Sequence, residues 1–279
     1  MNKQKVWFIT GASKGIGLEL TKLLLAKGEK VAATSRNAGD LAAQITNHKE
    51  NFLPVELDIT SDEKVKAAIA GVVATFGRID VVVNNAGFLL IGSMEELTDA
   101  EFRRSVDANL FGAVNVIRAV LPYMRAQQSG HIINISSGAG YFGAANASAY
   151  NAPKFALVGL TEALAGEVRP YGIHVTLVAP GVFRTNFLDT SSMQMTQNQI
   201  DVYQSAAMLK SWEQYSGAQP GDPARLVQII SDIAGLENPP QQLLMGPDVY
   251  QWVKDKRKAD DEVFETWKHL TLSTNFDNL

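Results

Sequence analysis

A tyrosine and a lysine in the stretch YNAPK, Tyr150 and Lys154, are the two side chains of this sequence best placed to perform chemistry together. Positions i and i+4 share one face of a helix, so the lysine ammonium would lie beside the tyrosine phenol. A neighbouring positive charge favours the phenolate and lowers the tyrosine pKa from its usual value of about 10. Such a tyrosine could exchange a proton near neutral pH, which is general acid–base catalysis.

Pro153 lies between these two residues, and a proline inside a helix removes one backbone hydrogen bond. The first N–H groups of a helix have no partner within it, and its first turn therefore tolerates proline. We expect a helix that begins near residues 148–150, in which Pro153 costs little or no hydrogen bonding. Taken alone, Tyr150 would more often be an ordinary helix-start residue, and Lys154 a solvated one.

A glycine-rich turn, TGASKGIG at residues 10–17, is the second chemical feature. It follows an apolar run and opens a helical pattern, so helix N-terminal amides would point at a phosphate and glycine would let the backbone approach it. A glycine triad also fits an ordinary turn, but this place between strand and helix favours dinucleotide binding. The expected cofactor-binding residues in the turn are Gly11, Ser13, Lys14, Gly15, Ile16 and Gly17.

The end of the second apolar run, AATSRN, should select the cofactor. An acidic residue there would bind the ribose 2′-hydroxyl of NAD, whereas an arginine would accommodate the 2′-phosphate of NADP. Ser35 stands at this place, Arg36 follows it, and Lys14 adds a second cation from the glycine turn. Two cations and a hydroxyl suit a phosphate, so we predict NADP(H), the alternative being two solvated basic side chains.

A sheet must position these residues, and apolar strand-like runs alternate with helical patterns along the chain. This alternation indicates a parallel sheet covered on both faces. The expected fold class is α/β: a single doubly wound, Rossmann-like domain over residues 1–279, with a mostly parallel sheet of about seven strands and helices on both faces. We expect strands at 5–10, 30–34, 52–57, 79–83, 131–135, 174–178 and 242–245, and helices at 16–26, 40–48, 61–76, 99–126, 150–169 and from about 247.

Polar residues follow the third, fourth and fifth expected strands. Ligands of a doubly wound sheet bind beyond the carboxyl ends of its strands. Asp58 could accept a hydrogen bond from an adenine amino group while Ile59 packs on the ring. The stretches NNAG, residues 84–87, and SSG, residues 136–138, would form polar turns at the same edge, although each alone could be ordinary turn chemistry. The expected cofactor-binding residues here are Asp58, Ile59, Asn85, Ala86 and Gly87.

Together, TGASKGIG, NNAG, a serine after the fifth strand and YxxxK thirteen residues past Ser137 resemble the short-chain dehydrogenase/reductase family. The resemblance is to the branch of shorter chains with GxxxGxG glycines, of the NADP(H)-preferring type. It is strong over about residues 5–185 and only general over 186–279. It implies Ser137, Tyr150 and Lys154 as catalytic residues, with Asn109 on the 99–126 helix as the fourth.

The resemblance also implies how these residues would act. The cofactor would transfer a hydride, while the protein supplies a proton and polarises a carbonyl. Tyr150 would be the general acid/base, Lys154 would also bond the nicotinamide ribose, and Ser137 would stabilise the developing alkoxide. Asn109 would hold a water behind Lys154. Four residues of APGVFRT after the sixth strand would bind the nicotinamide end of the cofactor: Pro180, Gly181, Phe183 and Thr185. Thr185 could instead simply cap a helix. Tyr150 and Lys154 would be further cofactor contacts.

Three segments would surround the substrate by the same resemblance. They are residues 88–90, residues 141–142, and a mostly polar insertion at 186–221 that would form a mobile substrate lid. Their apolar side chains, Phe88, Leu89, Leu90, Tyr141, Phe142, Met193, Met195, Met208, Trp212 and Tyr215, suggest a hydrophobic ketone, aldehyde or secondary alcohol unless they pack in the core.

The sequence therefore predicts an NADP(H)-dependent carbonyl reductase or alcohol dehydrogenase, and it leaves the physiological direction open. The alternative is a non-catalytic NADPH-binding regulator on the same fold, which the intact set of Ser137, Tyr150 and Lys154 disfavours. The resemblance implies a homodimer or homotetramer, because helices like 99–126 and 150–169 pair with symmetry mates in this family. A C-terminal helical extension, 247–279, could cover a surface or alter assembly.

Composition narrows the remaining possibilities. The chain has no cysteine, which excludes disulfides, thiolate catalysis and cysteine-ligated metals. Its net charge of −4 argues against a nucleic acid partner. No apolar run approaches the roughly 18–20 residues of a membrane span, and the N-terminus does not resemble a signal peptide, so we expect a cytoplasmic protein without a membrane partner. The histidines are isolated, and the pairs Glu95-Glu96 and Asp260-Asp261 are interpreted as solvated helix surface, so no metal site is expected.

Overall fold

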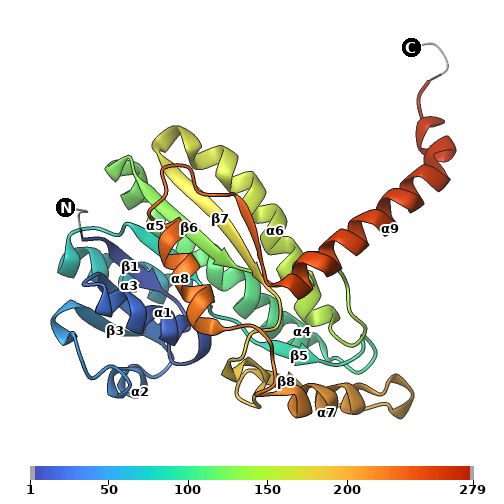
Figure 1. Ribbon diagram of the computed structural model, residues 1–279, viewed down its shortest axis with the longest axis horizontal. Coiled ribbons are helices and arrows are strands. Elements are labelled where there is room, and N and C mark those ends of the chain that lie inside the picture. The colour runs from blue at the N-terminus through green and yellow to red at the C-terminus, as the bar shows by residue number, and fades with distance from the viewer. Residues whose placement is uncertain (1–3, 277–279) are drawn as a thin grey trace.

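Seven parallel strands form one sheet across the molecule in the order β3-β2-β1-β4-β6-β7-β9, in a computed structural model that describes residues 4–276 (Figure 1). The order runs outward in both directions from β1 and β4, which is the doubly wound arrangement. The predicted α/β fold with a Rossmann-like sheet is confirmed. The strands are β1 (Val6–Ile9), β2 (Lys30–Ser35), β3 (Phe52–Glu56), β4 (Val81–Asn84), β6 (Gly130–Ile135), β7 (Ile173–Pro180) and β9 (Gln242–Met245).

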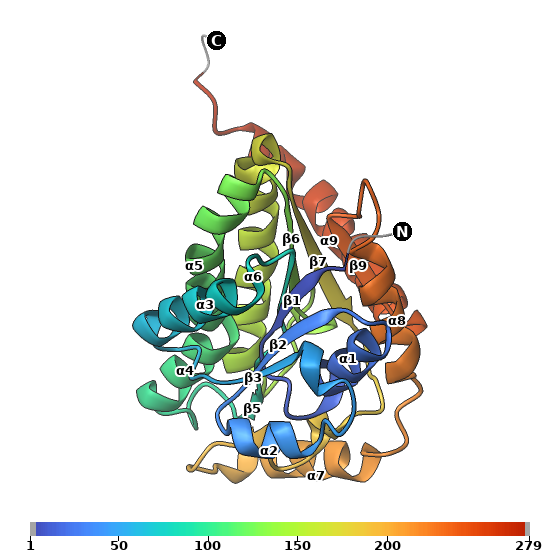
Figure 2. The ribbon, with the colours of Figure 1, turned by 90° about the vertical axis from the view of Figure 1, so that its left-hand side faces the viewer.

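Helices cover both faces of this sheet, which explains why its central strands are apolar throughout (Figure 2). Successive strand residues point to opposite faces. Trp7 and Ile9 of β1 pack with the helices of one face, whereas Val6 and Phe8 pack with those of the other. One face carries α1 (Gly15–Ala26) and α8 (Pro223–Ile233), and the other carries α3 (Asp62–Phe76), α5 (Gly112–Gln127) and α6 (Ser148–Val168).

The predicted helix at 99–126 is continuous in path but not uniform. It begins as α4 (Asp99–Val106), passes through a π-helical turn at Asp107–Phe111, and continues as α5 to Gln127. Thr98 caps its start, because the Thr98 hydroxyl accepts from the Glu101 N–H and the Glu101 carboxylate accepts from the Thr98 N–H. A π-helical turn marks functional positions in many proteins, and this one carries Asn109.

The predicted helix at 40–48 is wrong in its bounds. The helix found there, α2, spans Ala38–Ala43. It begins at Asn37, whose side chain accepts from the N–H groups of Gly39 and Asp40. It cannot reach residue 48, because His48 has a left-handed backbone with φ of 59°.

The 186–221 segment contains regular elements that the sequence did not indicate. Its strand β8 (Met193–Met195) pairs in parallel with β5 (Leu89–Ile91) to form a small second sheet. The helix α7 (Ser205–Tyr215) follows, and both lie with β5 at the lower end of the molecule in Figure 1. The segment therefore folds back onto the chain that follows β4.

The C-terminal helix α9 (Pro247–Leu272) begins against the body and then projects away from it (Figure 1). Val249 and Val253, near its start, are buried, whereas Phe264 and Trp267, further along, are exposed. Within the described part of the chain, no helix is both long enough and apolar enough to cross a bilayer.

Candidate functional site

The carboxyl edge of the sheet brings Ser137, Tyr150 and Lys154 together. Ser137 follows β6, and the other two lie on the first turns of α6. The Ser137 side chain lies within hydrogen-bonding reach of the Tyr150 phenol. The Lys154 ammonium lies 5.6 Å from the centre of the Tyr150 ring and donates to the Ile135 carbonyl oxygen at 3.0 Å. Ser136, in contrast, faces away and donates to the Lys154 carbonyl oxygen at 3.3 Å.

Helix α6 begins at Ser148, within the predicted range of 148–150. Pro153 is then its sixth residue and lies beyond the N–H groups that lack partners. Its missing N–H therefore removes a bond that Ala149 would have accepted. The Ser105 hydroxyl of α4 replaces that bond by donating to the Ala149 carbonyl oxygen at 2.7 Å. Pro153 therefore costs one hydrogen bond within the helix, where little or none was expected, and a neighbouring helix compensates the loss.

Burial dominates the electrostatics of the tyrosine–lysine pair. It raises the pKa of Tyr150 to about 12, against a smaller lowering by the Ser137 hydrogen bond. Burial also lowers the pKa of Lys154 to about 8. The prediction that Lys154 lowers the Tyr150 pKa is therefore wrong, because burial raises that pKa. The ammonium lies over the ring and donates to a backbone carbonyl, so it does not solvate the phenolic oxygen.

Asn109 lies in the π-helical turn and is only 2% exposed. Its side-chain nitrogen donates to the carbonyl oxygens of Phe88 and Ser105, each at 3.0 Å, and its oxygen accepts from the Phe88 N–H at 3.1 Å. A Cβ added to Gly87 would lie 2.5 Å from the Asn109 side-chain oxygen and 3.8 Å from the Lys154 nitrogen. Asn109 thus fixes the turn after NNAG directly beside Lys154.

The glycine turn and NNAG interlock at the ends of β1 and β4. The Thr10 hydroxyl accepts from the N–H groups of Asn85 and Ala86 at 3.0 and 3.1 Å. The Asn85 side chain donates to the carbonyl oxygens of Thr10 and Gly11, each at 3.0 Å. Gly17 must lack a side chain, because an added Cβ would lie 2.7 Å from both the Asn85 side-chain nitrogen and the Gly11 carbonyl oxygen. The two motifs therefore form one rigid unit, which we call the cofactor edge (residues 10–17 and 84–87).

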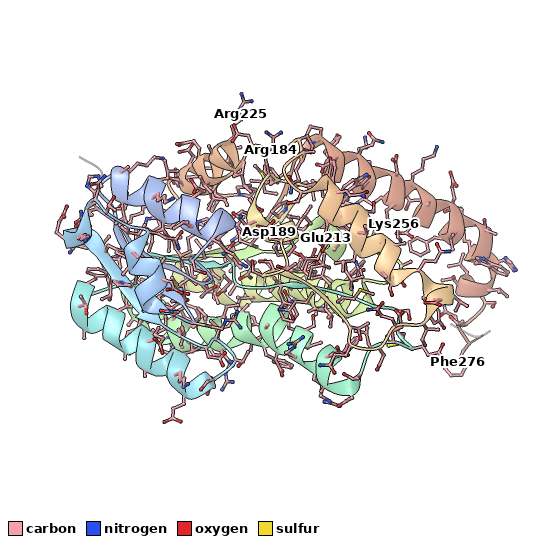
Figure 3. The ribbon with its side chains drawn as sticks, turned by 90° about the horizontal axis from the view of Figure 1, so that it is seen from below. Arg184, Asp189, Glu213, Arg225, Lys256 and Phe276 are labelled. Atoms are coloured by element: carbon pink, nitrogen blue, oxygen red, sulfur yellow. The ribbon has the colours of Figure 1, made fainter. Side chains whose placement is uncertain are left out.

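The remaining residues of the glycine turn make different contacts. Gly15 has φ of 56°, and a Cβ added to it would meet only Thr185, at 3.7 Å. Ile16 packs on the core, and the Ser13 carbonyl oxygen accepts from Gln44 at 2.9 Å. A cavity of about 510 Å³ lies between this turn and the start of the 186–221 segment. Figure 3 shows this side of the molecule with Arg184 and Asp189, two of the lining residues, labelled.

The expected 2′-phosphate corner places its two cations near each other. Burial lowers the pKa of Lys14, Asp189 opposes that lowering, and Arg36 adds to it. The Lys14 ammonium contacts the Ser191 hydroxyl at 2.6 Å, so it reaches toward the 186–221 segment. The Ser35 hydroxyl accepts from the Asn37 N–H at 3.2 Å and caps the turn after β2.

The expected adenine-binding residues, Asp58 and Ile59, also make contacts within the protein. The Asp58 carboxylate accepts from the Thr60 N–H and hydroxyl at 3.0 and 2.7 Å, and these bonds lower its pKa. Ile59 packs against Gly112 of α5, where an added Cβ would collide with it.

The residues after β7 connect the site to the C-terminal helix. Pro180 ends β7, and the Gly181 N–H donates to the Met245 carbonyl oxygen at 2.8 Å. A side chain at Gly181 would collide with the Asp248 carboxylate of α9, which accepts from the Val182 N–H at 2.7 Å. Phe183 forms an isolated parallel β-bridge with Gly221. Thr185 caps the short helix Asn186–Leu188 by accepting from the Phe187 N–H at 3.3 Å, which is the capping geometry anticipated as its alternative role.

An apolar wall covers Tyr150. The buried members are Leu89 and Ile91 of β5 with Leu188 and Met193, and Met208 and Trp212 of α7 pack against them. The Phe187 ring lies 6.1 Å from the Tyr150 ring, centre to centre. No local pattern singles out Phe187 and Leu188, which lie shortly before the strand β8 that pairs with β5.

Two predicted substrate residues lie elsewhere. The Tyr141 hydroxyl donates to Gln242 of β9 at 3.0 Å, and the Phe142 ring packs edge-on against Trp252 of α9 at 5.6 Å. Tyr141 thus contacts β9 and Phe142 contacts α9, and neither belongs to the wall over Tyr150.

The prediction that Glu96 is solvated is wrong. Glu96 was expected on a solvated helix surface, but it is 0% exposed and accepts hydrogen bonds from the 186–221 segment. Those bonds come from residues about a hundred positions away, so nothing in the local sequence indicates them. Among residues 4–276, no three histidine, aspartate or glutamate side chains gather closely enough to hold a metal ion.

Comparison with known sequences gives long matches. A sequence profile described as short chain dehydrogenase matches residues 5–196. The chain is 36% identical over 271 residues to oxidoreductase BOA17 of Botryotinia fuckeliana, covering 97% of this chain and 99% of that protein. It is 36% identical over 248 residues to a 3-ketodihydrosphingosine reductase of Bacteroides thetaiotaomicron, covering 87% and 88% of the two.

Solved structures share the same architecture. A short-chain dehydrogenase from Streptomyces avermitilis superimposes with a TM-score of 0.91 at 34% identity, covering 98% of this chain and 100% of that one. The structure of ElxO with NADP bound superimposes with a TM-score of 0.73 at 27% identity, covering 87% and 97%. The first match covers nearly the whole chain, so the likeness extends to the 186–221 segment and α9.

Proposed function

The chain belongs to the short-chain dehydrogenase/reductase family and is therefore an oxidoreductase, and on that premise we propose that it is an NADPH-dependent reductase of hydrophobic ketones or aldehydes. The observation that carries the proposal is the convergence of Ser137, Tyr150 and Lys154 beside the cofactor edge and beneath an apolar wall. The reverse reaction, oxidation of the matching secondary alcohol, uses the same groups.

The cofactor edge fits a dinucleotide. Helix α1 begins at Gly15 without a side-chain cap, whereas Ser61, Thr98 and Asp222 cap α3, α4 and α8. The first N–H groups of α1 thus remain available for a pyrophosphate, in the electrostatic environment that favours an anion. The fit is supported by Gly11 and Gly17, whose bare backbones pack against NNAG and hold the turn open.

The proton chemistry follows from burial. NADPH, when bound, supplies the hydride. Tyr150, with its pKa near 12, is fully protonated at neutral pH and can donate its proton to a carbonyl oxygen that becomes an alkoxide. Ser137 donates a hydrogen bond to the same oxygen. The phenolate left behind keeps the hydrogen bond of Ser137, which favours the charged form, until solvent returns the proton.

The cofactor preference rests on Lys14 and Arg36, two cations that lie near each other, and it is supported by the similarity to ElxO, whose structure was solved with NADP bound. In Arg36→Asp, NADPH should bind at least about tenfold more weakly, because a charge-assisted bond is lost and a repulsive carboxylate gained. NADH binding should change little. Fluorescence titration of both cofactors measures this, with Arg225→Asp on α8 as the control for a general loss of positive charge. Equal weakening of NADPH and NADH would contradict the NADPH assignment.

The substrate class rests on the apolar wall over Tyr150 and on the relative that reduces a keto group, 3-ketodihydrosphingosine reductase. A panel of aliphatic, aromatic and charged carbonyl compounds, followed by loss of NADPH absorbance, tests it. We expect activity that rises with the apolar size of the ketone. A preference for charged, sugar-like carbonyls would overturn the substrate class. NADPH binding without oxidation of any panel member would favour the non-catalytic regulator.

Assembly as a homodimer or homotetramer is part of the proposal. The helices that pair in this family correspond to α4–α5 and α6, which expose Phe111 and Phe155 at 50% and 44%. Sedimentation of the purified chain measures its mass, and a monomer would remove this part of the proposal.

A further inference from the structure

Two buried carboxylates, Glu96 and Glu101, join the start of α4 to the 186–221 segment. Glu96 is 0% exposed and Glu101 is 8% exposed. Neither forms an ion pair within residues 4–276. A buried carboxylate without a cation is costly unless hydrogen bonds satisfy its oxygens. The question is therefore which groups supply those bonds.

Glu96 is satisfied largely from the 186–221 segment. One oxygen accepts from the Ile200 N–H and the Ser205 hydroxyl, each at 2.8 Å. The other oxygen accepts from the Ser93 N–H at 2.7 Å. The Glu96 backbone carbonyl oxygen lies 3.0 Å from the Thr196 hydroxyl, whose single proton it shares with the Glu101 carboxylate. All of these donors are neutral, so the charge is held by oriented dipoles.

Glu101 makes the second set of contacts, one turn into α4. One oxygen accepts from the Gln197 N–H at 2.9 Å. The other accepts from the Thr196 hydroxyl at 2.9 Å and from the N–H and hydroxyl of Thr98 at 3.0 and 2.8 Å. Glu101 therefore serves both as the capping-box residue of α4 and as an acceptor for the segment.

These contacts fix one part of the segment, which we call the anchored part (residues 192–205). It is held at one end by β8 pairing with β5, and along its length by Glu96 and Glu101. Met193 of β8 belongs to the apolar wall over Tyr150. Residues 186–191, in contrast, make no contact with either carboxylate among the described hydrogen bonds.

We propose that Glu96 and Glu101 are positioning residues that hold the anchored part closed against α4, so that Met193 forms a fixed wall of the substrate site. Substrate then enters by movement of residues 186–191 and of α7 beyond Ser205, and not by a swing of the whole 186–221 segment. The inference rests on the proposed function, because it assigns the segment a role in substrate binding. Breaking the anchor requires two carboxylates to lose several charge-assisted bonds together, which makes this part rigid.

The variant Glu101→Gln tests the proposal. Its amide keeps the side-chain shape, but an NH₂ group would face N–H and O–H donors and could not accept from them. We expect KM for the carbonyl substrate to rise at least about tenfold, with a smaller fall in kcat, because the wall loosens while Ser137 and Tyr150 stay in place. NADPH binding should stay within about twofold of wild type, since the cofactor edge makes no contact with Glu101. Amide hydrogen exchange in residues 192–205 should accelerate, and exchange in residues 10–17 should not.

Glu95→Gln is the matched control. Glu95 is the exposed neighbour of Glu96, and it touches the segment through the Tyr203 hydroxyl. A solvated contact of this kind contributes little, so KM and exchange should match wild type. If Glu101→Gln does not fold, Thr196→Val and Ser205→Ala remove donors from the segment side and should raise exchange of the anchored part in the same direction.

A folded Glu101→Gln with unchanged KM and unchanged exchange would overturn the anchor. Exchange is measured without substrate, so it tests the anchor even if no carbonyl compound is reduced. Failure of the carbonyl panel together with accelerated exchange would overturn the proposed function and leave the anchor standing.

Discussion

The cofactor edge and the 186–221 segment lie at the same end of the sheet but are held in place differently. At the cofactor edge, Thr10 and Asn85 exchange hydrogen bonds directly after β1 and β4, neighbouring strands of the sheet. The 186–221 segment is held by Glu96 and Glu101, which belong to no strand of the large sheet. Parallel strands bring their carboxyl ends together by necessity, so the first kind of contact follows from strand order. The second kind depends on how segments outside that sheet are folded against each other.

This difference suggests a division of tasks. The cofactor edge would bind NADPH, which is the same in every turnover. Its glycines pack so closely against NNAG that the turn has little freedom to move. The 186–221 segment would adapt to a substrate, and it combines an anchored part with residues that lack such contacts. Variants that act on one region and spare the other test the division.

Tyr150→Phe should have the largest effect. The change removes the proton donor and keeps the ring that packs against Phe187. Turnover should fall about a thousandfold, the usual range for loss of a general acid, while KM and NADPH affinity change only a few-fold. Steady-state rates with a ketone and fluorescence titration of NADPH give the two quantities. If NADPH affinity fell as far as turnover, Tyr150 would belong to the cofactor edge and the division would fail.

Gly17→Ala should disturb the cofactor edge and spare the 186–221 segment. The new Cβ would lie 2.7 Å from the Asn85 side-chain nitrogen and the Gly11 carbonyl oxygen, so the turn must shift. We expect NADPH to bind at least about tenfold more weakly and unfolding to require about 1–3 kcal/mol less. Gly71→Ala in α3 is the matched control, because its Cβ meets nothing within 4 Å. That change should stabilise the helix by about 0.5–1 kcal/mol and leave NADPH binding alone.

The same difference explains what the sequence could predict. The sheet, its strand ends and the meeting of TGASKGIG with NNAG follow from periodicity and from the geometry of parallel strands. Burial of Glu96 could not be predicted, because its partners Ile200 and Ser205 lie more than a hundred residues away in an irregular segment. The tyrosine pKa was mispredicted for a related reason. Spacing placed Lys154 beside the ring, but only tertiary structure shows that its ammonium donates to Ile135.

The cost of Pro153 in α6 also depended on a distant partner. Helix rules predict that an interior proline leaves a carbonyl without its bond. They do not predict that the Ser105 hydroxyl, from another helix, donates to the Ala149 oxygen. Local rules thus identify the bond that is missing, and tertiary structure decides how it is replaced.

The smallest expected effect is the acid dependence of the Glu101 anchor. Burial alone would raise the Glu101 pKa, but hydrogen bonds from Thr98, Gln197 and Thr196 outweigh it and hold the pKa at about 2, against an ordinary 4.5. A lowered folded-state pKa means that the carboxylate stabilises the fold above pH 4.5 and loses that contribution as the pH falls toward 2. The protonated carboxyl resembles the amide of Glu101→Gln. Thermal unfolding midpoints of wild type and Glu101→Gln, separated by roughly 2–6 °C at neutral pH, should therefore converge as the pH drops through this range, while Glu95→Gln follows wild type throughout. A difference between the two midpoints that stays constant with pH would mean that Glu101 stabilises the protein through packing alone. The 186–221 segment would then not be held by buried charge, and that contrast with the cofactor edge would be lost.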